Sequence, residues 1–188
     1  MKSCRPLLGT YVDIRVDHPD AARAATALAS GFAAIEKVQR LMSAFDEDSD
    51  IGRINRLAHT EAVTVDAWPG DVLRLALNIH TTSAGLFDCG IAPRLAAWGM
   101  LPSANSIDYS RSSLSRLHID QNDGVTCDSP TRLDLGGIAK GYAVDRAAEA
   151  ILEAGADGGL INAGGDLRVF GAAEEAIYLR DPGRPEQL

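Results

Sequence analysis

The sequence predicts an α+β fold, with helices packed on mixed and antiparallel sheets, in one domain that spans residues 1–188. Three observations lead to this prediction. In several segments apolar residues recur every three or four positions, which is typical of helices with one buried side. Other segments alternate apolar and polar residues, as half-buried strands do. Asn122-Asp123-Gly124 separates two such segments and indicates a tight hairpin, which a purely parallel sheet would not contain.

The expected elements of the first half are one strand and three helices. Residues 9–16 alternate as a strand, and Pro19 then favours the first turn of a long helix, where its missing N–H is harmless. Ser49 is a natural N-cap for a short helix over residues 51–57, and Gly85 is a natural stop for a helix over residues 71–84. The buried stripe of the long helix is expected at Leu28, Phe32, Ile35, Val38, Met42 and Phe45.

The second half is expected to contain mostly strands, with one helix over residues 138–153. Residues 100–116 are rich in Ser, Pro and Asn, which predicts a loop. Residues 178–183 open a turn with no element after it, so we expect the sequence to be truncated at its C-terminal end. The strands are expected at 117–119, 125–127, 132–135, 160–162, 167–170 and 176–179.

Composition excludes several classes of protein. The 188 residues are 46% hydrophobic, enough for one packed core, and the formal net charge of -8 argues against a nucleic-acid partner, because phosphates would repel the chain. No stretch reaches about 18 apolar residues, so we expect no membrane span. The three cysteines lack C-x-x-C spacing, which predicts free thiols. The absence of a secretory signal predicts a cytoplasmic protein, or a periplasmic, cell-envelope protein whose export segment was removed.

A glycine-rich turn within residues 133–145 carries the most informative pattern. An expected strand ends at Gly136 and Gly137, and the following helix has Lys140 in its first turn. Free backbone N–H groups and the positive end of the helix favour an anion such as a phosphate, and the ammonium adds a full charge. The alternative is an ordinary turn with a solvated lysine. Asp134 could orient a ligand or cap the helix.

Two further segments could line a pocket. In residues 85–88, Phe87 and Asp88 could stack on and hydrogen-bond to a planar ring, or could be a core residue and a helix cap. Residues 162–166 form a Gly-Gly-Asp turn, which is common in proteins. The acidic stretch at 42–51 could be a metal site or a solvated connection, and it does not fit an EF-hand loop. The histidines lack the spacing of a metal site or a serine triad: His18, His59, His80 and His118.

Together and in order, these segments resemble the ApbE family, the FAD:protein FMN transferases. The resemblance covers nearly the whole chain and implies the α+β fold of that family. The matching segments are Leu8-Gly9-Thr10, residues 42–55, Gly85-Leu86-Phe87-Asp88, residues 133–145 and Ile161-Asn162-Ala163-Gly164-Gly165-Asp166-Leu167.

The resemblance also implies roles for individual residues. The main-chain carbonyl of Gly137 is implied as one Mg²⁺ ligand. Later Asp and Thr side chains complete the metal site in the family, so we expect an incomplete metal site in this sequence. The side chains implied at FAD are Leu8 (usually Met in the family) and Phe45 around the isoalloxazine, Leu86, Phe87 and Asp88 at the flavin nucleotide, and Asp134 and Lys140.

Members of the family bind FAD, use Mg²⁺, transfer FMN to a Thr or Ser hydroxyl of an acceptor flavoprotein, and release AMP. The resemblance implies this activity here, with a flavoprotein subunit of the redox-pump type as the partner. One alternative is a Mg²⁺-dependent FAD pyrophosphatase, in which water replaces the acceptor hydroxyl. Another is a non-enzymatic flavin-binding or inactive fragment. Typical members are exported lipoproteins, whereas no lipobox is visible in this sequence.

Overall fold

The computed structural model describes residues 1–102, 107–171, 175–178 and 183. In chain order its elements are β1 (Lys2–Leu7), β2 (Thr10–Asp17), α1 (Ala21–Met42), α2 (Asp50–Leu57), β3 (Val63–Thr64), α3 (Ala67–Thr82), the 3₁₀ helix η1 (Cys89–Ile91), α4 (Ala92–Ala97), the 3₁₀ helix η2 (Leu114–Arg116), β4 (Leu117–Ile119), β5 (Gly124–Cys127), α5 (Ala139–Glu153), β6 (Gly158–Ala163) and β7 (Asp166–Gly171).

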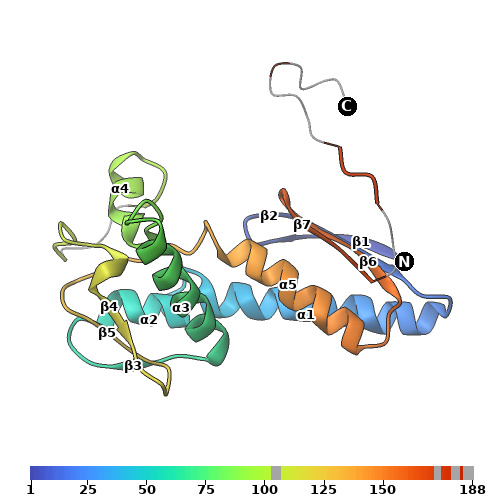
Figure 1. The fold of residues 1–188 in the computed structure, drawn as a ribbon, viewed down its shortest axis with the longest axis horizontal. Helices are drawn as coiled ribbons and strands as arrows, with labels where there is room; N and C mark the ends of the chain where they lie inside the picture. Colours follow the sequence, from blue (N-terminus) through green and yellow to red (C-terminus); the bar gives the residue numbers. More distant parts are fainter. Residues whose placement is uncertain (103–106, 172–174, 179–182, 184–188) are drawn as a thin grey trace.

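The long helix α1 runs along most of the molecule, with a different sheet near each of its ends (Figure 1). A four-stranded antiparallel sheet of order β1-β2-β6-β7 lies near the beginning of α1. A small antiparallel sheet of order β3-β5-β4 lies near α2 and α3 at the other end. The predicted mixture of helices and antiparallel sheets is therefore confirmed.

Helices α1 and α5 cover one face of the four-stranded sheet, and the apolar side chains of that face are buried (Figure 1). The two helices approach closely at Gly31, where an added Cβ would lie 2.6 Å from Ile151 Cδ1. This packing carries α5 along α1 and fixes the beginning of α5 near the middle of the molecule. The sheet residues buried in this interface include Val12, Ile14, Val16, Ile161 and Phe170.

Several elements differ from the sequence-based prediction. Strand β1 was not predicted, because it is an edge strand whose residues do not alternate between apolar and polar. Pro6 is tolerated in β1 because an edge strand can lack one backbone N–H donor. Helix α1 begins after its N-cap Asp20, so Pro19 precedes the helix, and it ends at Met42, so Phe45 lies beyond it. Helix α3 begins earlier than expected, at Ala67.

Other differences concern loops and short elements. Residues 132–135 form no strand, and helix α4 was not predicted. Residues 176–178 form no strand, and residue 179 lies outside the described residues, as does most of the turn expected at 178–183. Cys89 and Cys127 are buried and Cys4 is exposed, and all three thiols are free. Among the described residues, no helix combines the length and the hydropathy that crossing a membrane requires.

Candidate functional site

Four side chains predicted at a flavin site line one cavity of about 380 Å³. They come from four separate parts of the chain: Leu8 from the β1–β2 turn, Phe45 from the segment after α1, Asp134 from the segment before α5, and Lys140 from the first turn of α5. The floor includes the end of α1 around Val38 and Met42, so the cavity is mostly apolar with charged groups at one side. Such a combination suits a flat, largely apolar ligand with an anionic tail.

Leu8 enters the cavity from a strained turn. Leu8 and Gly9 both have positive φ, of 55° and 70°, as in the type I′ turns that close two-residue hairpins. Glycine and asparagine adopt this conformation readily, whereas leucine pays an energetic cost. The Leu8 N–H donates to Gln39 Oε1 on α1 at 2.6 Å, which fixes the turn against the helix. A strained leucine beside a cavity indicates that its side chain serves the cavity.

Phe45 stands in a connection whose two ends are held. Ser49, the N-cap of α2, accepts the Gly52 N–H and donates its hydroxyl to the Ser43 carbonyl at 2.5 Å. Between these anchors the Phe45 side chain remains 69% exposed. A large apolar ring left in solvent at the edge of a cavity is available for stacking on a ligand.

The glycine-rich turn beside the cavity contains unpaired amides, and Gly136 and Lys140 of this region line the cavity. The N-cap position of α5 is Ile138, which supplies no side-chain acceptor, and the first turn contains no acidic residue. The N–H groups of Gly137, Lys140 and Gly141 donate no hydrogen bond to any residue that the structure describes. These free donors and the helix dipole favour a negative charge at this point.

Lys140 is neither a solvated lysine nor an unpartnered charge. Its Nζ donates to the Gly136 carbonyl at 3.2 Å and pairs with Asp166 Oδ2 at 3.4 Å. Because an ammonium has three N–H donors, two contacts hold it and one remains for a ligand. The pairing also brings to the site the 162–166 turn, which the sequence offered as a possible pocket lining, although no role was predicted for Asp166 itself.

Asp134 bonds within the turn and does not cap α5, whose N-cap position is Ile138, so the predicted role as a helix cap is wrong and the role at a ligand stays a prediction. Its Oδ1 accepts the Gly136 N–H at 2.6 Å, and its own N–H donates to the Cys89 carbonyl at 2.8 Å. Cys89 is buried beside the carboxylates of Asp88 and Asp134, and burial raises the pKa of its thiol to about 12. This thiol is therefore protonated at neutral pH and is no nucleophile.

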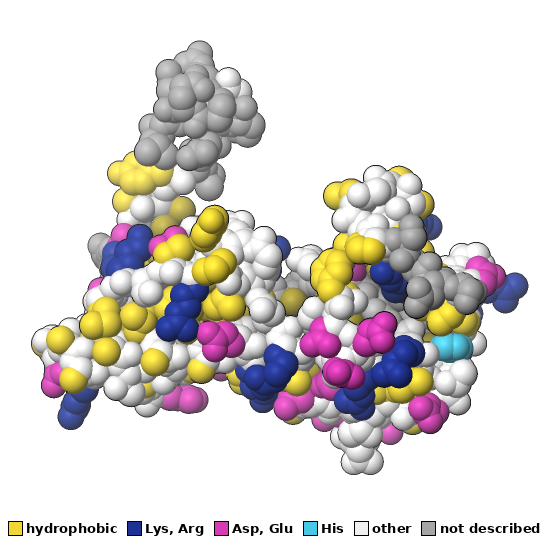
Figure 2. Space-filling view, turned by 180° about the vertical axis from the view of Figure 1, so that it is seen from behind, with side chains coloured by type: hydrophobic (Ala, Val, Ile, Leu, Met, Phe, Trp, Pro, Cys, Tyr) yellow, Lys and Arg dark blue, Asp and Glu magenta, His cyan; other side chains and the backbone are white. Residues whose placement is uncertain are grey.

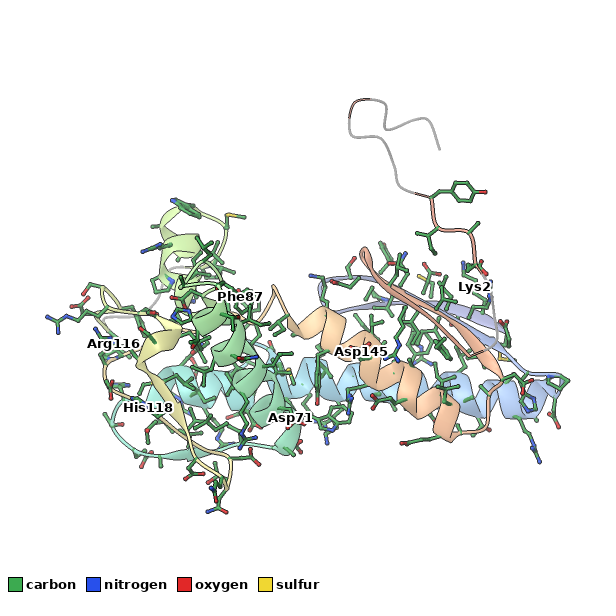
Figure 3. The ribbon with its side chains drawn as sticks, viewed as in Figure 1. Lys2, Asp71, Phe87, Arg116, His118 and Asp145 are labelled. Carbon is green, nitrogen blue, oxygen red and sulfur yellow. The ribbon has the colours of Figure 1, made fainter. Side chains whose placement is uncertain are left out.

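The three side chains predicted at the flavin nucleotide, Leu86, Phe87 and Asp88, have different surroundings. The Phe87 ring borders the glycine turn, with its Cε2 3.7 Å from the point where a Cβ on Gly137 would lie, and Figure 3 places Phe87 near the chain leading into α5. Leu86 is 92% exposed. The Asp88 carboxylate is occupied inside its loop, because it accepts the N–H groups of Gly90 and Leu114 and a serine hydroxyl.

The predicted Mg²⁺ site can be compared with the residues that the structure describes. Gly137 is an exposed residue, and its carbonyl accepts no hydrogen bond from the described part of the chain. No group of three His, Cys, Asp or Glu side chains among the described residues could hold a metal ion. In the acidic stretch at 42–51, Asp50 instead pairs with Arg53 and accepts the Asp66 N–H, which is the behaviour of a structural connection.

A second cavity of about 290 Å³ adjoins the first and shares Ala44 and Phe45 with it. The sequence analysis did not predict this cavity, because residues 44–56 meet residues 102 and 107–132 only in the folded chain. Its polar lining includes Arg56, Tyr109 and Arg132.

Comparison with known proteins identifies the family to which the chain belongs. Residues 8–187 match the profile of the ApbE family. The FAD:protein FMN transferase of Vibrio cholerae is 24% identical over 186 residues, which cover 93% of this chain and 56% of the relative. An FAD:protein FMN transferase of Klebsiella pneumoniae is 26% identical over 174 residues, which cover 85% of this chain and 50% of the relative. The chain thus spans about half the length of the curated relatives it matches.

Solved structures with the same fold include the flavin transferase ApbE from Vibrio cholerae, with a TM-score of 0.80 at 24% identity. The ApbE protein from Thermotoga maritima has a TM-score of 0.78 at 28% identity. Each comparison covers 90% of this chain and 58% of the other.

Proposed function

The chain belongs to the ApbE family, and from this premise we propose that it supplies the flavin-binding part of an FAD:protein FMN transferase. The observation that carries the proposal is the cavity that gathers Leu8, Phe45, Asp134 and Lys140 beside the free amides of the glycine turn. Apolar walls and an anion-favouring edge are the two environments that a flavin dinucleotide requires.

In this proposal the isoalloxazine ring of FAD packs between Leu8 and Phe45. The diphosphate lies against the Gly137 amide and the third N–H donor of Lys140, while Asp134 keeps the turn in shape. Residues 86–88 contact the flavin nucleotide, with the Phe87 ring next to the turn and Asp88 holding the loop.

The proposed reaction is a phosphoryl-type transfer. A Thr or Ser hydroxyl of the acceptor flavoprotein attacks the FMN phosphorus, the bond from that phosphorus to the bridging oxygen breaks, and AMP leaves with the electron pair. The hydroxyl loses its proton as the new P–O bond forms, and we assign no base to it. The Lys140 ammonium and the amides of the α5 N-terminus stabilise the charge that develops on the phosphate oxygens.

Magnesium dependence is part of the proposal, with the Gly137 carbonyl as one ligand. A single carbonyl does not satisfy Mg²⁺, which needs carboxylates and substrate phosphates at octahedral geometry. The described residues do not complete that set, so no step of the reaction is assigned to the metal. A redox-pump flavoprotein subunit is the proposed acceptor, and the compartment remains the prediction made from the sequence.

The experiment supplies the protein with FAD, Mg²⁺ and an acceptor flavoprotein, then measures AMP release and covalent flavin on the acceptor. We expect both products, and we expect Lys140→Ala to lower the rate about 10- to 100-fold, because one charge contact to the transition state is lost. Lys2→Ala is the matched control, since Lys2 is an exposed lysine on β1 outside the cavity. AMP without labelled acceptor would identify an FAD pyrophosphatase. No AMP release and no FAD binding would overturn the proposal.

A further inference from the structure

The loop that carries Phe87 is held by the C-terminal end of α3. Phe87 donates its N–H to Ser83 Oγ at 3.1 Å, and its carbonyl oxygen lies 2.8 Å from His80 Nδ1. Both backbone groups of this residue are therefore bound to one end of one helix. The helix itself ends in a tight turn, in which Ala84 and Gly85 have φ of 52° and 82° and the Gly85 N–H donates to the His80 carbonyl.

The neighbours of the His80 ring indicate its tautomer, that is, which ring nitrogen carries the hydrogen. Nδ1 faces the Phe87 carbonyl at 2.8 Å and Asp88 Oδ2 at 4.0 Å, and both of these oxygens are acceptors. A lone pair on Nδ1 would be repelled by both, so Nδ1 carries the hydrogen and donates to Phe87. The His80 side chain is only 16% exposed, so water competes little for this hydrogen bond.

The held loop is in turn attached to the glycine turn at two points. The Phe87 ring lies against Gly137, and the Asp134 N–H donates to the Cys89 carbonyl at 2.8 Å. A displacement of the Phe87 carbonyl would therefore move the ring that borders the amides of the turn. Figure 3 shows Phe87 between α3 and the chain that enters α5, where this transmission has to occur.

We propose that His80 is a positioning residue of the flavin site, which holds the Phe87 carbonyl and so keeps the Phe87 ring against the Gly137 turn. The inference rests on the proposed function, because it assigns His80 a role in binding FAD. His80 lines neither cavity, so its effect on the site is indirect and passes through the Phe87 carbonyl, to which its Nδ1 donates.

Two variants separate the hydrogen bond from the volume of the ring. His80→Leu keeps a buried side chain of similar size and removes the donor. His80→Asn keeps an N–H donor at the δ position, the same number of bonds from the backbone as Nδ1. Thermal unfolding of each variant shows that both are folded before any binding is compared.

The first measurement is FAD binding, followed by flavin fluorescence. We expect His80→Leu to raise the Kd about tenfold, the cost of one lost buried hydrogen bond, and His80→Asn to stay within about twofold of the wild type. The spectrum of bound flavin should change in His80→Leu and be restored in His80→Asn. Equal Kd values for wild type and His80→Leu, or no rescue by asparagine, would overturn the inference.

The second measurement needs no flavin. Amide hydrogen exchange at Gly90 and Asp134 reports whether the loop still holds the turn, since these N–H groups donate to Asp88 and Cys89. Faster exchange in His80→Leu, with wild-type exchange in His80→Asn, supports the inference, and unchanged exchange in His80→Leu overturns it. Failure of the wild type to bind FAD would count against the proposed function and would be seen before the variants are compared.

Discussion

At the tip of the β1–β2 hairpin, Leu8 has a strained backbone conformation, and its side chain lines the cavity. Its φ of 55° costs about 1 kcal/mol that an asparagine would largely avoid. The side chain is half-buried against the core, so an asparagine would also lose apolar contact. In the free energy of unfolding, the relief of backbone strain by asparagine offsets the loss of apolar contact. The cavity, however, loses an apolar side chain from its wall.

We therefore expect Leu8→Asn to change the free energy of unfolding by less than about 1 kcal/mol while weakening FAD binding about tenfold. Urea unfolding and flavin fluorescence measure the two quantities. Leu8→Met, which keeps an apolar side chain of similar volume, is the control and should bind FAD like the wild type. An asparagine variant that binds FAD normally would show that the strained leucine does not serve the ligand.

The buried thiols make stability depend on alkaline pH. Burial raises the pKa of Cys89 to about 12 and of Cys127 to about 11, from an ordinary value of 9.0. Above pH 9 the unfolded chain loses these protons while the native protein keeps them, so the native state binds more protons and stability falls as pH rises. We expect each thiol to cost about 1 kcal/mol at pH 10.

Urea unfolding at pH 8 and pH 10 tests this dependence on pH. Replacing Cys89 and Cys127 together by alanine should reduce the loss of stability between the two pH values, even though the alanines lower stability at both. Cys4→Ala is the control, because Cys4 is exposed on β1. An unchanged pH dependence in the double variant would contradict the assignment.

At the level of elements, two helical glycines differ in what faces them. A Cβ on Gly52 of α2 would lie 2.0 Å from the backbone oxygen of Asp46, in the connection that carries Phe45. A Cβ on Gly31 of α1 would meet side chains instead, with Ile151 Cδ1 at 2.6 Å, Ile151 Cγ1 at 2.8 Å and Ile14 Cδ1 at 3.4 Å. Backbone cannot move without shifting the connection, whereas an isoleucine can change rotamer.

Gly52→Ala should therefore destabilise the protein by about 2 kcal/mol or more and weaken FAD binding, because the segment around Phe45 must shift. Gly31→Ala should remain within about 1 kcal/mol of the wild type, since the gain in helix propensity offsets the repacking of Ile151. Thermal unfolding compares the two variants directly. The opposite order of stabilities would show that the Asp46 backbone yields more easily than the core.

The sequence predicted the elements that are determined by nearby residues, such as helices with regular apolar spacing and hairpins with typical turn residues. The α1 stripe as far as Met42, the α5 boundaries to within one residue and the β4–β5 hairpin were predicted from spacing and turn residues, whereas Phe45 lies beyond α1 and is exposed. Strand β1 has no such pattern, because its place depends on pairing with β2. The site divides in the same way, since the glycine turn and Lys140 lie together in the sequence. The Asp166 partner of Lys140 and the hold of His80 on Phe87 arise only when separate elements pack.

Over the whole molecule, one aromatic and cationic cluster joins the two ends. Trp68 of α3 lies edge-on to Tyr142 of α5, with ring centroids 6.2 Å apart. Lys37 of α1 lies 4.1 Å from the Trp68 ring centre, so three helices meet at this point. Elsewhere on the surface the charges are mixed, and Figure 2 shows acidic and basic side chains interspersed along one face rather than gathered by sign.

The cluster predicts opposite effects of two substitutions. The Tyr142 hydroxyl is buried, and it has no hydrogen-bond partner among the residues that the structure describes. Tyr142→Phe keeps the ring and removes this unpaired group, so we expect a gain of about 1 kcal/mol in stability.

Trp68→Ala removes the contact that links α3 to α5, and we expect a loss of about 2 to 3 kcal/mol. Each end of the molecule has its own sheet, so the loss of this contact should also allow the two ends to unfold separately. Amides of α3 should then exchange at lower urea than amides of β6. Hydrogen exchange at increasing urea distinguishes the outcomes. If α3 and β6 still exchange together in Trp68→Ala, the buried surface along α1 couples the two ends, and the cluster contributes stability without carrying the connection.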